Sequence, residues 1–69
     1  MQFSPEGNEQ MAHSYEVAAT RVLMARERTV NRMARAVLYM TARRFEKAAD
    51  WHRARAETDR RRHAEKTQP

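Results

Sequence analysis

Few side chains in this sequence have the types and spacing that catalysis or metal binding requires. His13, His52 and His63 are far apart and lack the i, i+4 spacing that brings two imidazoles to one metal ion. Glu46 and Asp50 are four residues apart, but basic residues surround them, which favours helix ion pairs over acid–base catalysis. The chain has no cysteine and a single glycine, which excludes thiolate ligands, disulfides and a glycine-rich phosphate loop. We therefore expect no enzyme, no bound metal and no cofactor.

The sequence does place one aromatic side chain among arginines. On a helix whose inner face includes Val30, Tyr39 lies on the opposite, charged face. Its neighbours on that face are Arg32, Arg35, Arg43 and Glu46. Tyr39 either rests on arginine stems at a solvated surface or contacts a partner, because Tyr and Arg are enriched among the residues that dominate binding.

Three residues of the first half of the chain are further candidates for partner binding. Arg26 follows Val22 by one turn, so it falls within the apolar stripe close to the end of the predicted helix. It either extends to solvent and the terminal carbonyls, or acts as an anchor at the tip for a partner carboxylate or carbonyl. Val17 and Met24, seven residues apart, point away from the stripe as an exposed apolar pair beside arginines.

The elements that carry these residues are helices. Neither glycine nor proline occurs between Asn8 and Gln68, and strong helix formers dominate that span. The sequence Ser4-Pro5-Glu6 is typical of a helix start, with a capping hydroxyl, a first-turn proline and an acidic residue. We predict an all-α protein with one helical domain over 1–69. Its helices cover about 5–28 and about 31–64, and a frayed basic tail covers about 60–69.

The apolar pattern favours an antiparallel hairpin. A polar stretch at 26–29 separates two apolar stripes, and Thr29 or Asn31 could cap the second helix. Folding the chain there pairs Val22 with Val37 and Tyr15 with Phe45, and the core set is Tyr15, Val22, Val37, Leu38 and Phe45. One long bent helix or coiled coil remains the alternative, because the turn lacks the glycine that helix ends prefer.

A two-helix hairpin of this length has only one seam in which to bury apolar side chains. About ten such side chains, many of them alanine, cannot offset the conformational entropy of ordering some 60 residues at about 1–2 kcal/mol each. We therefore expect a homodimer in which two hairpins form a four-helix bundle. The same apolar side chains would serve as core and as dimer interface.

The charge of the chain admits two classes of partner. The sequence carries 14 Lys+Arg against 9 Asp+Glu, so its formal net charge is +5. The longest apolar run, 36–40, is far too short to cross a bilayer, and no signal peptide is visible, so we expect a cytoplasmic protein without a membrane partner. Arginine binds phosphate, and Tyr39 and Trp51 could stack on bases, so a small nucleic-acid-binding protein is one alternative. Interleaved acids favour the other, a protein-binding modulator.

The chain as a whole resembles the anti-quorum-sensing proteins of temperate Pseudomonas phages. The resemblance covers the stretch 24–33, the following Ala36-Val-Leu-Tyr-Met40 and the Arg60–Arg62 run. It implies a helical dimer in the host cytoplasm that binds the LuxR-type quorum-sensing regulator LasR at its DNA-binding region. It also implies binding to the ATPase that drives type IV pilus assembly, which hinders infection by further phages.

Overall fold

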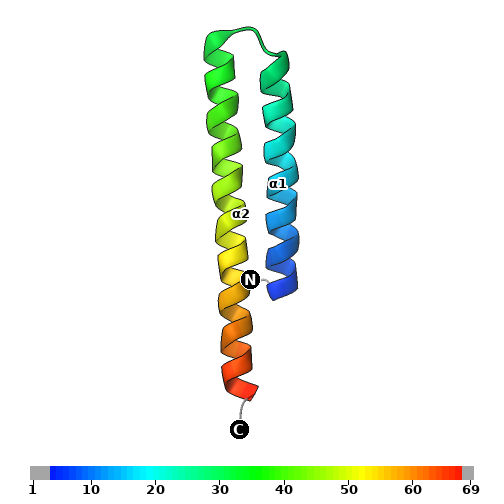
Figure 1. The fold of residues 1–69 in the computed structure, drawn as a ribbon, viewed down its shortest axis with the longest axis vertical. Coiled ribbons are helices and arrows are strands. Elements are labelled where there is room, and N and C mark those ends of the chain that lie inside the picture. The colour runs from blue at the N-terminus through cyan, green and yellow to red at the C-terminus, as the bar shows by residue number, and fades with distance from the viewer. Residues whose placement is uncertain (1–3, 68–69) are drawn as a thin grey trace.

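The chain forms two antiparallel helices joined by a short turn. The computed structural model describes residues 4–67, in which α1 spans Pro5–Arg28 and α2 spans Arg32–Thr67. The helices run side by side in a rod of 60 × 19 × 14 Å, and α2 continues well past the start of α1 (Figure 1). The predicted all-α hairpin is confirmed, and the alternative of one continuous helix is wrong.

Side-chain caps explain where the helices begin. The Gly7 N–H donates to Ser4 Oγ at 3.0 Å, and Pro5 occupies the first turn of α1, where its missing N–H costs nothing. At the start of α2 the Ala34 N–H donates to Asn31 Oδ1, also at 3.0 Å. Asn31 is therefore the cap of α2, one of the two residues that the sequence offers for that role.

A seam of alanines holds the two helices together. Ala12 and Ala19 of α1 and Ala42, Ala49 and Ala56 of α2 are 1–4% exposed, and members of each set are seven residues apart. This heptad spacing is that of a coiled coil, and a methyl side chain at every seventh position lets two backbones approach closely. The seam thus brings the helices together, and no large apolar side chain within residues 4–67 is completely buried.

Larger side chains cover one side of this seam, which we call the aromatic flank: Tyr15, Val22, Leu38, Phe45 and His52, all of them half-buried. The Tyr15 ring lies 5.9 Å from that of Phe45, as the predicted pairing of the helices requires, and stacks on His52 at 5.6 Å. Asn8, only 2% exposed, places its Oδ1 2.7 Å from His52 Nδ1. Because an amide oxygen only accepts, the imidazole nitrogen is the donor in this contact.

The structure contradicts the predicted inner stripe of the second half of the chain at Val30, Val37 and also at Met33, which is 79% exposed. Val37 is 61% exposed and Val30, in the turn, is 95% exposed, so neither belongs to the core of the hairpin. The reason is the alanine seam. Val37 is five residues before Ala42, and this spacing puts its side chain about 150° around α2 from the seam. Close approach through alanine therefore decides the rotation of α2, and the β-branched side chains are left outside.

The C-terminal part of α2 is helical as far as Thr67, where the sequence analysis expects fraying from about residue 60. Two contacts stabilise this part: an ion pair from Arg60 to Glu9 on α1, and one from Arg61 to Glu57 at 2.6 Å. The last two residues of the predicted tail, 68–69, lie outside the described residues. In the described part of the chain, neither helix is long and apolar enough to cross a membrane.

Candidate protein-binding surface at the turn

The turn at residues 29–31 is closed by an arginine of α2. Arg35 Nη1 donates to two carbonyl oxygens at the end of α1, those of Arg26 at 3.1 Å and Thr29 at 3.0 Å. Thr29 itself is extended, with φ −94° and ψ 126°, and no residue between 4 and 67 has a positive φ. The guanidinium thus satisfies carbonyls that a left-handed glycine cap would otherwise serve, which explains a tight turn without glycine.

This arrangement corrects the predicted role of Arg35. The sequence predicts Arg35 on the charged face around Tyr39, as a candidate for partner binding. In the structure its side chain is half-buried and committed to the α1 carbonyls. Arg35 therefore supports the turn and is not an exposed binding group.

Arg26 and Tyr39 form the central contact of the turn region. The Arg26 guanidinium carbon lies 5.6 Å from the centroid of the Tyr39 ring, which is the geometry of a cation–π contact. Tyr39 is 49% exposed, so one part of its surface covers the arginine and the rest faces solvent. Arg26 Nε is buried and has no hydrogen-bond partner. The sequence predicts Arg26 within the apolar stripe of one helix and Tyr39 on the outer, charged face of the other, but in the structure the two side chains make one surface, the Arg26–Tyr39 surface.

The register of the seam explains why these two residues meet. Tyr39 is four residues after Arg35 and three before Ala42, so it flanks the seam by about 50°. Projection along a helix from Val30 predicts Tyr39 on the side of α2 away from α1. This prediction is wrong for the same reason as the prediction for Val37, because α2 is rotated about its axis relative to the predicted orientation. Arg26 holds the seam position seven residues after Ala19, and its length carries the guanidinium out to the ring.

The other candidate residues remain on the surface around this contact. Arg32 and Arg43 are exposed, and Arg43 pairs with Glu46 at 3.3 Å. Met24 is 51% exposed on the side of α1 away from α2. Val17 is half-buried and lines a shallow hollow of about 380 Å³ farther along α1.

Two ion pairs between the helices continue along the same side of the hairpin, away from the turn. Arg53 pairs with Glu16, and Arg60 pairs with Glu9. The hydrogen bond from Arg60 lowers the pKa of the Glu9 carboxyl, desolvation opposes this shift, and the charge of Arg60 adds to it. We call this side the ionic flank, and the Arg26–Tyr39 surface lies at its turn end.

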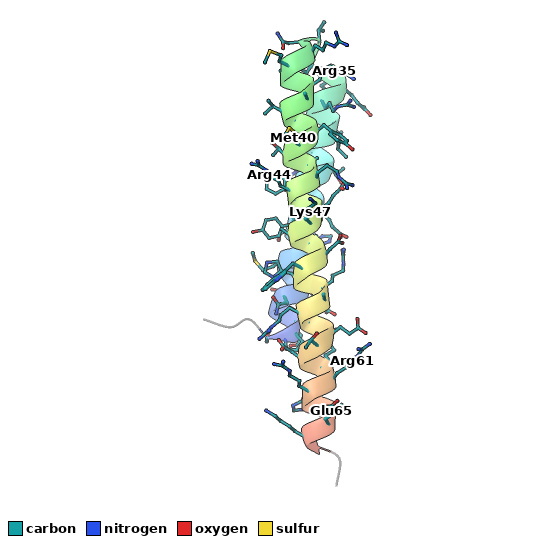
Figure 2. All side chains as sticks on the ribbon, turned by 90° about the vertical axis from the view of Figure 1, so that its left-hand side faces the viewer. Arg35, Met40, Arg44, Lys47, Arg61 and Glu65 are labelled. Carbon is teal, nitrogen blue, oxygen red and sulfur yellow. The ribbon has the colours of Figure 1, made fainter. Side chains whose placement is uncertain are left out.

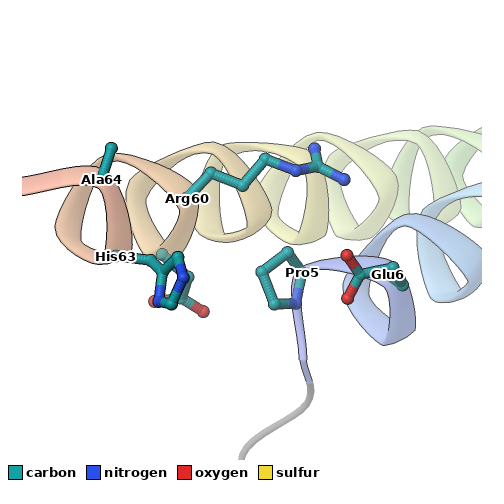
Figure 3. A pocket seen from close by; sticks show the side chains of 6 residues that line it. Pro5, Glu6, Arg60, His63 and Ala64 are labelled. Atoms are coloured by element: carbon teal, nitrogen blue, oxygen red, sulfur yellow. The ribbon is translucent and has the colours of Figure 1, made fainter. Parts of the chain in front are cut away.

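The open end of the hairpin has a hollow of about 640 Å³ between the start of α1 and the last turns of α2. Figure 3 shows Pro5 and Glu6 on one side and His63 and Ala64 on the other, with Arg60 reaching along α2. Both signs of charge line it, so it has no consistent preference for one ligand charge. Across residues 4–67, no group of three or more His, Cys, Asp or Glu side chains could hold a metal ion.

Sequence reasoning missed the polar contact of Asn8 with His52, because His52 was treated as an isolated histidine. The signal was present: Asn8, Ala12, Tyr15 and Ala19 alternate by four and three residues, which marks one heptad seam. A buried asparagine in such a seam must find a partner on the facing helix.

Comparison with known proteins adds no relative. No protein-family model, curated protein or solved structure matches the chain.

Proposed function

We propose that the protein is a small phage-type regulatory protein that binds and inhibits host proteins in the host cytoplasm. The resemblance of the sequence suggests two targets. One is the LuxR-type regulator LasR, whose DNA binding would be blocked. The other is the type IV pilus assembly ATPase, whose inhibition would exclude superinfecting phages.

The Arg26–Tyr39 surface is the single observation that carries this proposal. A half-exposed tyrosine beside an arginine is an amphipathic contact, and these two residue types dominate the energetics of many protein interfaces. The buried Arg26 Nε without a partner costs free energy in the unbound protein. A partner oxygen that moves the guanidinium away from the ring could accept a hydrogen bond from this Nε. Binding would then supply a hydrogen bond that the free hairpin lacks.

A homodimer belongs to the same proposal. Among the described residues of the single hairpin, complete burial is restricted to five alanines and Asn8, and the large apolar side chains of the aromatic flank stay half-exposed. A second copy packed on this flank would bury Tyr15, Leu38 and Phe45 of both copies. Each Å² of apolar surface removed from water stabilises the dimer by about 25 cal/mol. Because the ionic flank lies on the other side of the seam, the dimer would leave the Arg26–Tyr39 surfaces open.

The partner-binding proposal is tested with purified LuxR-type regulator and pilus ATPase. We expect each to be captured by the wild-type protein, and capture by Tyr39→Ala or Arg26→Ala to fall about 30-fold or more, the scale of a binding hot spot. Arg61→Ala is the matched control, since Arg61 is exposed and pairs only within α2. Circular dichroism verifies that the variants keep their helices. Equal capture by wild type and both turn variants would refute the role of this surface.

The dimer is tested by sedimentation equilibrium. Ala48 is half-buried beside Phe45 on the aromatic flank, so Ala48→Glu should place a charge in the dimer interface and shift the protein to monomer. Ala54, exposed on the outer side of α2, provides the control, and Ala54→Glu should leave the assembly unchanged. A wild-type protein that sediments as a stable folded monomer at micromolar concentration would end this part of the proposal.

Binding of nucleic acid is the second candidate, and the clustering of arginine around the turn favours it. Residues 28–45 contain five arginines and no acidic residue. Tight, salt-sensitive retardation of duplex DNA at physiological salt, lost when these arginines are replaced, would select this function over the first.

A further inference from the structure

The outer side of α2 near the turn carries an apolar stripe that nothing in the hairpin covers. Val30 is 95% exposed, Met33 79%, Val37 61% and Met40 57%. Met33, Val37 and Met40 are spaced by four and three residues, so they form one line on the side of α2 away from α1, and Val30 precedes them in the turn. We call this line the methionine stripe. Figure 2 looks onto this side, where Met40 is followed along the helix by Arg44 and Lys47.

The stripe lies in the part of the chain that holds its whole net charge. Residues 28–45 include five arginines and no acidic residue, which equals the formal net charge of +5, and the remaining nine basic residues balance the nine acidic ones. Arg35 and Arg43 are engaged within the hairpin, by the α1 carbonyls and by Glu46. Within residues 4–67, the other three, Arg28, Arg32 and Arg44, take part in no salt bridge. The apolar line is therefore flanked by positive charge that lacks an internal counterpart.

We propose that the methionine stripe with Arg32 and Arg44 is a docking surface for an acidic amphipathic helix of a partner protein. Met and Arg are enriched in protein interfaces, and methionine adapts to partners of different shape. A helix that presents apolar side chains at i, i+3, i+4 and i+7 would cover the stripe, and carboxylates beside them would meet the arginines. These two exposed arginines, Arg32 and Arg44, supply the charge complementarity that selects an acidic partner over a neutral one.

Two other occupants fit less well. An interfacial membrane helix needs a long apolar face, but here the line stops at Met40 because Arg44 and Lys47 occupy the next turns of the same face. Nucleic acid would use the arginines, but aliphatic side chains offer bases no stacking surface. Tyr39 lies about 100° around α2 from Met40, but Arg32 lies seven residues before Tyr39 on the same side of the helix, so the two surfaces meet at Arg32. The test therefore relies on Met33, Met40 and Arg44, which lie outside the Arg26–Tyr39 surface, so that failure here is distinguishable from failure of the proposed function.

The test uses three labelled synthetic peptides of about 18 residues, long enough to form a helix on binding. One is an acidic amphipathic helix, the second has the same composition in scrambled order, and the third replaces every Glu by Lys. Fluorescence anisotropy measures affinity, and methyl NMR of the full-length protein locates binding. We expect only the acidic amphipathic peptide to bind and to shift the methyl signals of Met33 and Met40, with Met11 as an internal reference. Arg44→Glu and Met40→Ala should each weaken binding about tenfold.

Control measurements give each competing occupant its own outcome. Met24→Ala, which removes an exposed methionine from α1, should leave peptide binding unchanged. Equal binding of the scrambled peptide would overturn the proposal, because charge alone would then suffice. Shifts of Met33 and Met40 produced by anionic vesicles, by duplex DNA or by raising the protein concentration would also overturn it, in favour of a membrane, a nucleic acid or a second copy. Failure of every peptide to move these signals would contradict it as well.

Discussion

Replacing Arg35 by alanine should open the turn of the hairpin. The substitution removes the hydrogen bonds from Arg35 to the carbonyls of Arg26 and Thr29. The Arg26 oxygen keeps the Thr29 N–H as a donor, and the Thr29 oxygen is left to water. A hydrogen bond from a charged donor contributes about 1.5–3 kcal/mol, and these two share one nitrogen in a partly exposed position, so we take the lower part of the range. The expected loss of unfolding free energy is about 2 kcal/mol, or about 8–16 °C in Tm for a domain of this size.

The assay is thermal and urea unfolding followed by circular dichroism, at one fixed protein concentration because self-association would shift the apparent stability. Arg32→Ala is the matched control: it removes an exposed arginine one turn earlier, and its effect should stay within about 0.5 kcal/mol. Arg35→Lys keeps the charge but offers a single ammonium group, so its loss of unfolding free energy should lie between those of Arg32→Ala and Arg35→Ala. If Arg35→Ala proved no more damaging than Arg32→Ala, the explanation of how this turn closes without glycine would be refuted.

Two further substitutions test the seam and the ionic flank. Ala49→Leu should destabilise the hairpin by about 1–3 kcal/mol through overpacking, whereas Ala54→Leu on the exposed side should be nearly neutral. Equal unfolding free energies of the two variants in urea would contradict the close packing of the helices at the alanine seam. Because the pKa of Glu9 is lowered in the folded state, its contact with Arg60 stabilises the fold fully above the unfolded pKa of about 4.3 and is lost as pH falls through the folded value. Melting curves should therefore show wild type more stable than Glu9→Gln near pH 6, with the gap closing towards pH 3; a gap independent of pH would disprove the contribution.

The hairpin was predictable because local signals agree with each other. Ser4 and Asn31 are good caps, the span between the terminal prolines favours helix throughout, and the polar stretch before Asn31 interrupts the apolar pattern. These features depend on neighbours in sequence, so a reading of the chain finds them. They determine where helices start and end, and hence that the chain doubles back.

The rotation of α2 was harder to predict because it depends on contact across the seam. Large apolar residues normally identify a core, which led to Val30 and Val37, whereas the structure buries Ala42 and Ala49. The seven-residue spacing of the alanines indicates which side of α2 faces α1. A ranking of residues by hydrophobicity does not detect it, because alanine ranks below valine. The same limit applies to the candidate surface. The sequence indicates Tyr39 as a candidate binding residue, but its contact with Arg26 depends on how α2 is rotated about its axis.

The central claim, that the turn region grips a host protein, is tested most directly by hydrogen exchange with mass spectrometry on the complex with purified LuxR-type regulator. The account predicts slower exchange on complex formation in residues 22–44, around Arg26 and Tyr39, and unchanged exchange at the open end, residues 5–12 and 56–67. Protection confined to the open end, with the turn exchanging as it does in the free protein, would contradict it.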